Sequence, residues 1–315
     1  MKNKMMRIAS VLLVAALITT CAISGTFAKY VTKVSGEDSA RVAKWGIVLD
    51  IASDGIFAEK YAASDKAYLK AEGEYSVESS VEGEKVVAPG TNSKEVGTTL
   101  VASVKGTPEV ATRYTLTGNV EDIVLPAATG YTDYTELVKG DDGKYGYTKT
   151  FDLEKDYAPV KWNMTITKGN TTLNVAEALY ANLPANLISA AENYGLTPTG
   201  CSFFDAVKIL AKVAGSDTYK QVVDAALGSI VSGGRNFQLE VTDDGFTLGY
   251  DFDANKAMDF TFELTWEWAF EQENVELYDK ADTLLGNIAA EVCEAPEGAS
   301  TVIGATLTAT AVQID

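Results

Sequence analysis

The residues from Phe260 to Phe270 constrain the fold of this chain more than any other segment. Phe260, Phe262, Leu264, Trp266, Trp268 and Phe270 alternate there with Thr261, Glu263, Thr265, Glu267 and Ala269. Successive side chains of a β-strand point to opposite faces, so this run predicts a strand with one buried face and one wet face. Such a strand is typical of an antiparallel sheet that covers a core on one side.

Other segments show the same alternation less strongly. They are residues 45–51, 95–104, 112–120, 160–167 and 301–314, and we expect the last of them to close a sheet. Residues 173–194 and 202–230 change to helical spacing, with Ser202 placed to cap the second helical run and Gly233-Gly234 placed to end it. The pattern predicts a mainly β chain with an α-helical insertion at 171–234.

The N-terminus has the three parts of a secretion signal. Lys2, Lys4 and Arg7 give it positive charge, residues 8–23 are mostly apolar, and Thr26-Phe27-Ala28 supplies small residues for cleavage. We therefore expect a signal peptide at 1–28, cleavage between Ala28 and Lys29, and a secreted chain that forms a single domain over 29–315. The apolar run of roughly 16 residues is shorter than the ~20 that span a bilayer, although a retained anchor or lipidation at Cys21 are alternatives.

The first residues after the expected cleavage point favour a β-strand. Lys29, Tyr30, Val31, Thr32, Lys33 and Val34 are rich in β-formers, and Ser35-Gly36-Glu37-Asp38-Ser39 follows as a small, polar joint. A strand with such a joint behind it can pair with its own sheet or with the sheet of another molecule. The region 29–50 is therefore a candidate donor of a strand to a second copy.

Charge narrows the range of partners. The full chain has 26 basic and 44 acidic residues; loss of Lys2, Lys4 and Arg7 would leave 23 basic against all 44 acidic, a net charge of about −21. Such a charge repels phosphate backbones, so nucleic acid is not expected as a partner. Self-assembly would have to rest on strand pairing or buried apolar contacts, and it should respond to salt.

Several of these segments resemble the TasA/camelysin family of secreted bacterial matrix and surface proteins. The similar stretches are the cleavage junction at 25–30, the approach to the first strand at 39–45, Val87-Ala88-Pro89-Gly90-Thr91, and Thr265-Trp266-Glu267-Trp268 followed by residues 279–287. The resemblance implies a jelly-roll β-sandwich and polymerisation into extracellular matrix or cell-surface fibres. It also implies that Lys29 to Val34 of one subunit completes the sheet of its neighbour by β-augmentation. Partners would be the protein itself and, as further possibilities, other matrix proteins or cell-wall components.

Enzymatic chemistry is not expected. The chain has no histidine, which removes His-Glu-x-x-His zinc sites, Ser-His-Asp triads and Cys-His pairs. Glu263, Glu267 and Glu271 could act as a carboxylate pair, but a solvated strand face explains them better. We expect no catalytic residues, no cofactor and no metal.

Three smaller features each leave an alternative open. Residues 251–255 begin like a calcium loop, but Lys256 and Phe262 occupy positions that need glycine and glutamate, so only a looser site with Asp243, Asp244 or Asp259 remains. Trp266, Trp268 and Tyr250 could form a sugar-stacking platform, although their alternation favours core packing. Cys201 and Cys293 either form a disulfide or remain as partly buried thiols.

A monomeric adhesin or carbohydrate-binding module remains the alternative to a fibre subunit.

Overall fold

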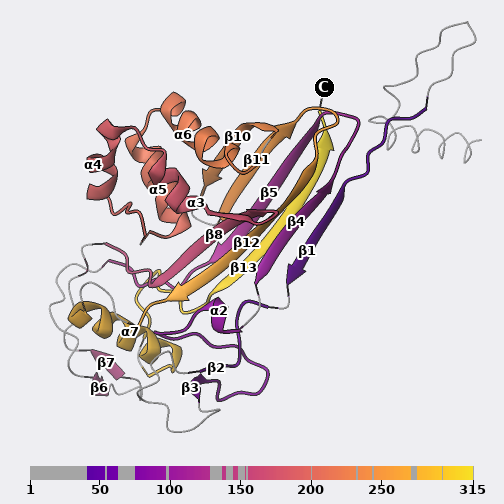
Figure 1. Ribbon diagram of the computed structural model, residues 1–315. Coiled ribbons are helices and arrows are strands. Elements are labelled where there is room, and N and C mark those ends of the chain that lie inside the picture. The colour runs from indigo at the N-terminus through magenta and orange to yellow at the C-terminus, as the bar shows by residue number, and fades with distance from the viewer. Residues whose placement is uncertain are drawn as a thin grey trace, which may run out of the picture.

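The computed structural model describes residues 41–53, 55–62, 75–96, 99–127, 137–139, 145–147, 153, 155–199, 201–231, 233–242, 245–270, 275–292 and 294–314. Two antiparallel sheets face each other across one core (Figure 1). The five-stranded sheet has the order β1 (Val48–Ser53), β4 (Leu100–Gly106), β12 (Met258–Trp268), β8 (Val160–Lys168) and β9 (Thr171–Asn174). The four-stranded sheet has the order β10 (Gly234–Val241), β11 (Gly245–Phe252), β5 (Thr112–Glu121) and β13 (Gly304–Gln313).

Aromatic side chains join the two sheets. The Tyr114 ring on β5 stacks on Phe262 of β12 at 5.8 Å and meets Phe260 edge-on at 5.9 Å between ring centroids. Tyr250 on β11 lies 5.2 Å from Tyr114, and all of these rings are buried. The predicted buried face of β12 is therefore confirmed, because its alternating aromatic residues lie in the core. Phe270 is an exception, because β12 ends at Trp268 and Phe270 is 67% exposed.

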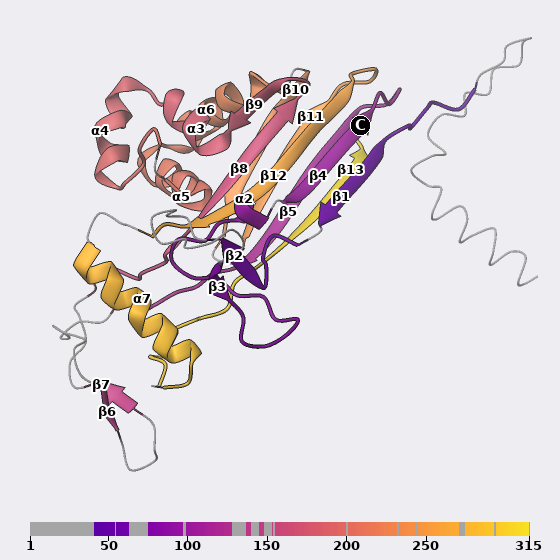
Figure 2. The same cartoon turned by 60° about the horizontal axis from the view of Figure 1, so that its bottom comes forward.

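The helical insertion lies between β9 and β10 in the chain, and it packs beside the edge strands β9 and β10 of the two sheets (Figures 1 and 2). It contains α3 (Val175–Ala181), α4 (Ala185–Asn193), α5 (Phe203–Val213) and α6 (Ser216–Gly228). The expected start at residue 171 is corrected, because 171–174 form β9 and extend the sheet. Phe203 and Phe204 of α5 pack edge-on against Phe246 of β11, which fixes the insertion to the sandwich.

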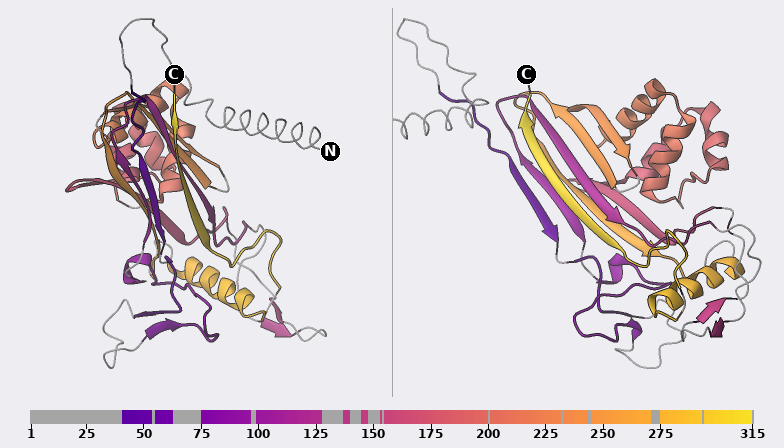
Figure 3. Two further views of the ribbon diagram at one scale, coloured as in Figure 1. Left: turned by 90° about the vertical axis from the view of Figure 1, so that its right-hand side faces the viewer. Right: turned by 180° about the vertical axis from the view of Figure 1, so that it is seen from behind.

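A second group of short elements lies at the opposite end from the C-terminus (Figure 3). It includes the two-stranded pair β2 (Lys60–Ala62) and β3 (Tyr75–Glu78), the pair β6 (Leu137–Lys139) and β7 (Tyr145–Tyr147), and α7 (Val275–Ala289). The helix α2 (Ser93–Val96) takes the first residues of the strand expected at 95–104, which starts only at Leu100. None of the described helices combines the length and the apolarity that a membrane crossing needs.

Two serines complete the central strands where the neighbouring strands end. Trp266 on β12 and Trp162 on β8 are direct cross-strand partners. The Ser93 hydroxyl accepts a hydrogen bond from Trp266 N at 3.1 Å, and the Ser202 hydroxyl accepts one from Trp162 N at 3.2 Å. Ser202 was expected to cap a helix, but its side chain makes no capping bond. Its hydroxyl instead bonds to β8 at Trp162, where β9 does not pair with that strand.

Candidate assembly edge and polar groove

The predicted cleavage site and donor strand fall outside the part of the chain that the structure describes. This holds for all of their residues: Ala28, Lys29, Tyr30, Val31, Thr32, Lys33 and Val34. The neighbouring prediction of a strand at 45–51 is confirmed in part, because β1 begins at Val48 and pairs with β4 of the same chain from Val48↔Lys105 to Ser53↔Leu100. The last residues of the region 29–50, from Val48 to Asp50, thus enter their own sheet, and only residues before β1 remain as a candidate donor.

An ion pair attaches residues 41–44 to the loop between β4 and β5. The Arg41 guanidinium binds both carboxylate oxygens of Glu109 at 2.5 and 2.6 Å, and Lys44 N donates to the same carboxylate at 3.0 Å. The hydrogen bond from Arg41 holds the pKa of Glu109 down at about 2. Residues 41–47 therefore leave the sandwich at the turn between β4 and β5, the end at which the C-terminus also lies (Figures 1 and 3).

The strand β13 is an edge strand without the usual protection. It pairs with β5 over ten residues, Gly304↔Glu121 to Gln313↔Thr112, without a shift in register. Its sequence, GATLTATAVQ, contains no charged residue and no proline. Natural edge strands are normally blunted by lysine, proline or a bulge, because an exposed flat edge pairs with further strands.

The register shows which backbone groups of β13 point away from β5. Ile314 N donates to Ala111 O at 2.9 Å, so this pair is hydrogen-bonded, and such pairs alternate with non-bonded ones along an antiparallel ladder. Thr308, Thr310 and Val312 therefore direct their backbone groups to β5. The backbone groups of Ala305, Leu307, Ala309 and Ala311 face outward, and among the described residues no strand pairs with them.

Core-facing side chains are incompletely covered beside this edge. The strands β1 and β13 lie next to each other on the open side of the sandwich, each at the edge of a different sheet (Figure 2). Ile51 of β1 is 37% exposed although it pairs with Ala102 at the fully buried face of β4. Leu49 and Ala309 are only partly buried. A further strand along this seam would find both backbone partners and apolar side chains.

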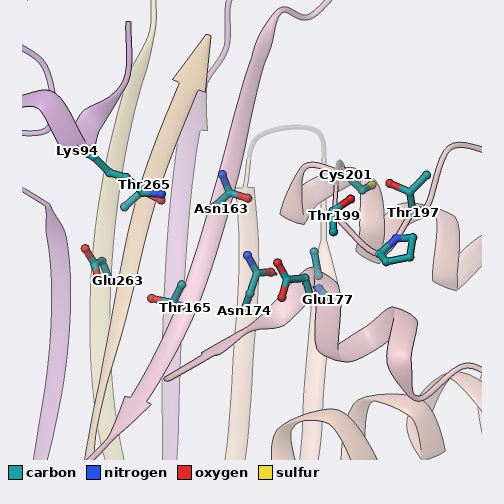
Figure 4. A pocket seen from close by; sticks show the side chains of 12 residues that line it. Lys94, Asn163, Thr165, Asn174, Glu177, Thr197, Thr199, Cys201, Glu263 and Thr265 are labelled. Atoms are coloured by element: carbon teal, nitrogen blue, oxygen red, sulfur yellow. Dashed lines mark hydrogen bonds between the residues drawn. The ribbon is translucent and has the colours of Figure 1, made fainter. Parts of the chain in front are cut away.

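A polar groove of about 230 Å³ lies on the outer face of the five-stranded sheet (Figure 4). Its floor consists of Glu263 and Thr265 on β12 and their cross-strand partners Thr165 and Asn163 on β8. Lys94 of α2 stands on one side, and on the other are the first turn of α3, residues 197–199 and Cys201. Thr265 is 7% exposed, so neighbouring residues cover this part of the sheet face and solvent has little access to it.

Burial suppresses ionisation next to the groove. Desolvation raises the pKa of the Cys201 thiol to about 12, with the neighbouring Asp205 carboxylate adding to the effect. Cys201 is a free, half-buried thiol, whereas Cys293 lies outside the described residues. The raised pKa disfavours the thiolate, which is the nucleophilic form of cysteine.

A larger, mainly apolar cleft of about 480 Å³ lies against α7. Trp268, Leu285 and Ile303 contribute to its walls, with Lys85 and Asp282 as its charged groups. The Tyr157 hydroxyl donates to Asp282 at 2.7 Å, while burial raises the pKa of this carboxyl to about 6.

The acidic residues named from the sequence do not gather in one place. Glu263 is half-buried in the groove, Glu267 is exposed beyond it, and Glu271 lies outside the described residues. Asp251 is buried and bound to Arg113 at 2.6 and 2.9 Å, and Asp253 pairs with Arg235 at 2.7 Å. Within the described ranges no three His, Cys, Asp or Glu side chains cluster as metal ligands do; Asp243 and Asp244 lie outside those ranges.

The tryptophans belong to the core. Trp266 and Trp268 are 1% and 4% exposed, and Tyr250 is 1% exposed, so core packing is confirmed and these three rings form no exposed sugar platform. The groove itself was missed, although Asn163, Thr165, Glu263 and Thr265 are the polar positions of two predicted strands. The uncharged composition of 304–313 was the available sign of an unprotected edge.

Neither the models of known protein families, nor characterised proteins, nor solved structures give a match to this chain.

Proposed function

We propose that this protein is a secreted structural subunit that polymerises into extracellular matrix or cell-surface fibres by exchange of its N-terminal strand. The signal-like residues 1–28 support export, and the β-forming run Lys29 to Val34 supports a donor strand. The observation that carries the proposal is the outer edge of β13, which is long, regular and uncharged in a chain of net charge −18. The strand β13 is then the acceptor.

The directions of the strands favour exchange between copies over folding back. Residues 41–47 lie at the end toward which β13 runs, so a donor segment before Arg41 would start from that end (Figure 1). If it folded back onto its own β13, it would run parallel to that strand. If it extended into a copy stacked end to end in the same orientation, it would run antiparallel to the neighbour's β13. Antiparallel pairing is slightly more stable per residue, and it is the only kind found in both large sheets.

A contact of this kind is heterologous and does not close on itself, so repetition produces a fibre. Main-chain hydrogen bonds to Ala305, Leu307, Ala309 and Ala311 would supply cohesion. Apolar donor side chains would cover the partly exposed Ile51 and Leu49 beside the seam. Since every copy carries the same high negative charge, salt should promote growth of the fibre by screening repulsion.

We further propose that the two facing sheets form a jelly roll. The consecutive strands β4 and β5 lie in different sheets, and so do β11 and β12. Since β4 pairs with β12 and β5 pairs with β11, these four strands form a two-stranded ribbon folded over from one sheet to the other. Nested pairing of this kind is the basis of the jelly roll. The helices α3 to α6 stand in the connection from β8 to β10.

The decisive experiment compares purified protein starting at Lys29 with protein starting at Ser35, by negative-stain electron microscopy at low and high salt. Filaments are expected only from the longer chain. Ala309→Pro should also prevent them, because proline removes an outward N–H while leaving the bonds to β5 intact. Ala309→Ser keeps that N–H and should still form filaments.

Monodisperse particles from the longer chain under every condition would contradict the fibre proposal. They would favour a monomeric adhesin on the cell surface, in which the N-terminal strand pairs with its own sheet. Filaments that persist in folded Ala309→Pro protein would instead show that β13 is not the acceptor.

A further inference from the structure

We propose that the polar groove across β8 and β12 binds a single neutral or amino-bearing sugar residue of a glycan. The inference goes beyond fibre assembly, because the groove lies on the outer face of the five-stranded sheet, whereas β13 is an edge of the other sheet. It rests on the shape of the groove, its supporting contacts and the chemistry of its lining.

The groove is held open by the core beneath it. Ser93, next to Lys94, binds the backbone of Trp266 at both N and O, at 3.1 and 3.4 Å. Ser202, next to Cys201, does the same for Trp162, at 3.2 and 3.3 Å. Both serines are buried. The two walls are therefore attached to adjacent central strands, and a ligand would meet a preformed site.

One hydroxyl on the floor lacks a partner. Thr165 Oγ1 is inaccessible to solvent and makes no hydrogen bond in the protein. A buried hydroxyl without a partner is unfavourable, and most such groups in folded proteins are bound by protein, water or ligand. Thr165 stands in the middle of the lining, between Glu263 and Asn174, which are its direct cross-strand partners on either side (Figure 4). Rotation of Thr165 about χ1 would turn this hydroxyl toward the groove. A ligand hydroxyl above the row could then bind all three residues.

The lining suits a compact molecule with many hydroxyls. Thr165, Thr199 and Thr265 can each donate and accept, and so can the Asn163 amide. Asn174 Oδ1 already accepts from Glu177 N at 3.2 Å, which leaves its amide nitrogen as a donor toward the groove. Cross-strand neighbours stand about 5 Å apart, a spacing similar to the width of a sugar ring. The lining contains no aromatic ring, so binding would depend on hydrogen bonds and would be weak at a single site.

Charge selects among sugars. Glu263 and Glu177 stand on opposite sides of Thr165, and Lys94 is the cation of the lining. Two carboxylates against one ammonium repel phosphates and uronic acids and attract an amine. Copies repeated along a fibre would add avidity to weak single sites.

The test is saturation-transfer NMR on the folded protein starting at Ser35, which lacks the donor segment. The probes are N-acetylglucosamine, glucosamine and glucuronate. Transfer to the first two and none to glucuronate is expected. Thr165→Val should weaken binding about tenfold by removing one hydrogen bond, without lowering the melting temperature. Thr117→Val, on β5 of the other sheet, is the matched control and should bind as the parent does.

Absence of transfer to every probe would overturn the proposal, as would equal transfer in the parent and in both Thr165→Val and Asn163→Ala. Preferential binding of glucuronate would contradict the charge argument. Because this protein lacks the donor segment, none of these results depends on whether the longer chain forms filaments.

Discussion

The Ser93 hydroxyl takes the place of a neighbouring strand for Trp266. It accepts from the Trp266 N–H and donates to the Trp266 carbonyl, beyond the point where β4 stops pairing with β12 at Leu100↔Leu264. Both residues are almost completely buried. Since water cannot replace either bond, a four-residue helix far away in the sequence completes the central strand.

Ser93→Ala should therefore destabilise the protein by about 2 kcal/mol, because two buried backbone groups would lose their partner. Chemical denaturation measures this loss. Ser79→Ala provides the comparison, since the Ser79 hydroxyl bonds only to Val81 on the exposed surface. An equal effect of the two substitutions would contradict the role assigned to Ser93.

Glu109→Gln should release the N-terminal segment without unfolding the sandwich. The Arg41 ion pair is exposed, and exposed pairs contribute little to global stability. Limited proteolysis should cut more rapidly within 41–46, while the melting temperature changes little. Asp259→Gln, at the long 3.9 Å contact with Lys105, should leave the cleavage rate unchanged. Unaltered cleavage in Glu109→Gln would mean that other contacts hold the segment.

Tyr114→Phe should stabilise the protein. The hydroxyls of Tyr114 and Tyr250 are buried in the aromatic core without hydrogen-bond partners, and burial raises the pKa of both. Removing such a hydroxyl while retaining the ring should raise the free energy of unfolding by about 1 kcal/mol. Tyr61→Phe should do the opposite, because its hydroxyl accepts a bond from Ala58 N at 2.9 Å. Denaturation curves of the two variants should move in opposite directions.

Stability should rise as the pH falls from 7 to 5. Burial raises the pKa of Asp122 to about 6, with the nearby Asp205 carboxylate adding to the shift. The folded state thus holds a proton on Asp122 that the unfolded chain releases above about pH 4. The stabilisation that this proton provides is complete below about pH 4 and is lost above about pH 6. Asp122→Asn should remove part of the rise; the rest comes from Asp282, whose pKa burial also raises to about 6. Below pH 4 stability should fall, because the bond from Arg113 lowers the pKa of Asp251 and acid removes that pair. Thermal melts measured from pH 7 to below pH 4 would show both the rise and the later fall in stability.

Strand patterning could be predicted because a residue's preference for core or water acts locally. The alternation at 260–268 and the runs that became β5 and β8 each placed the correct face inward. The strands β10 and β11 and the helix α7 were missed. The burial pattern of β11 is nearly continuous, and such a run has no period-two signal to detect.

The sequence by itself determined the mainly β composition, the buried face of β12, the helical spacing of the insertion and the high negative charge. Each of these follows from the chemistry of neighbouring residues. Only the tertiary structure decided that β13 lies at an edge and that Asn163, Thr165, Glu263 and Thr265 form one groove. Those relationships depend on pairing between strands about a hundred residues apart, as in Thr165↔Glu263, and the local residue pattern of a strand does not show which strands become its neighbours.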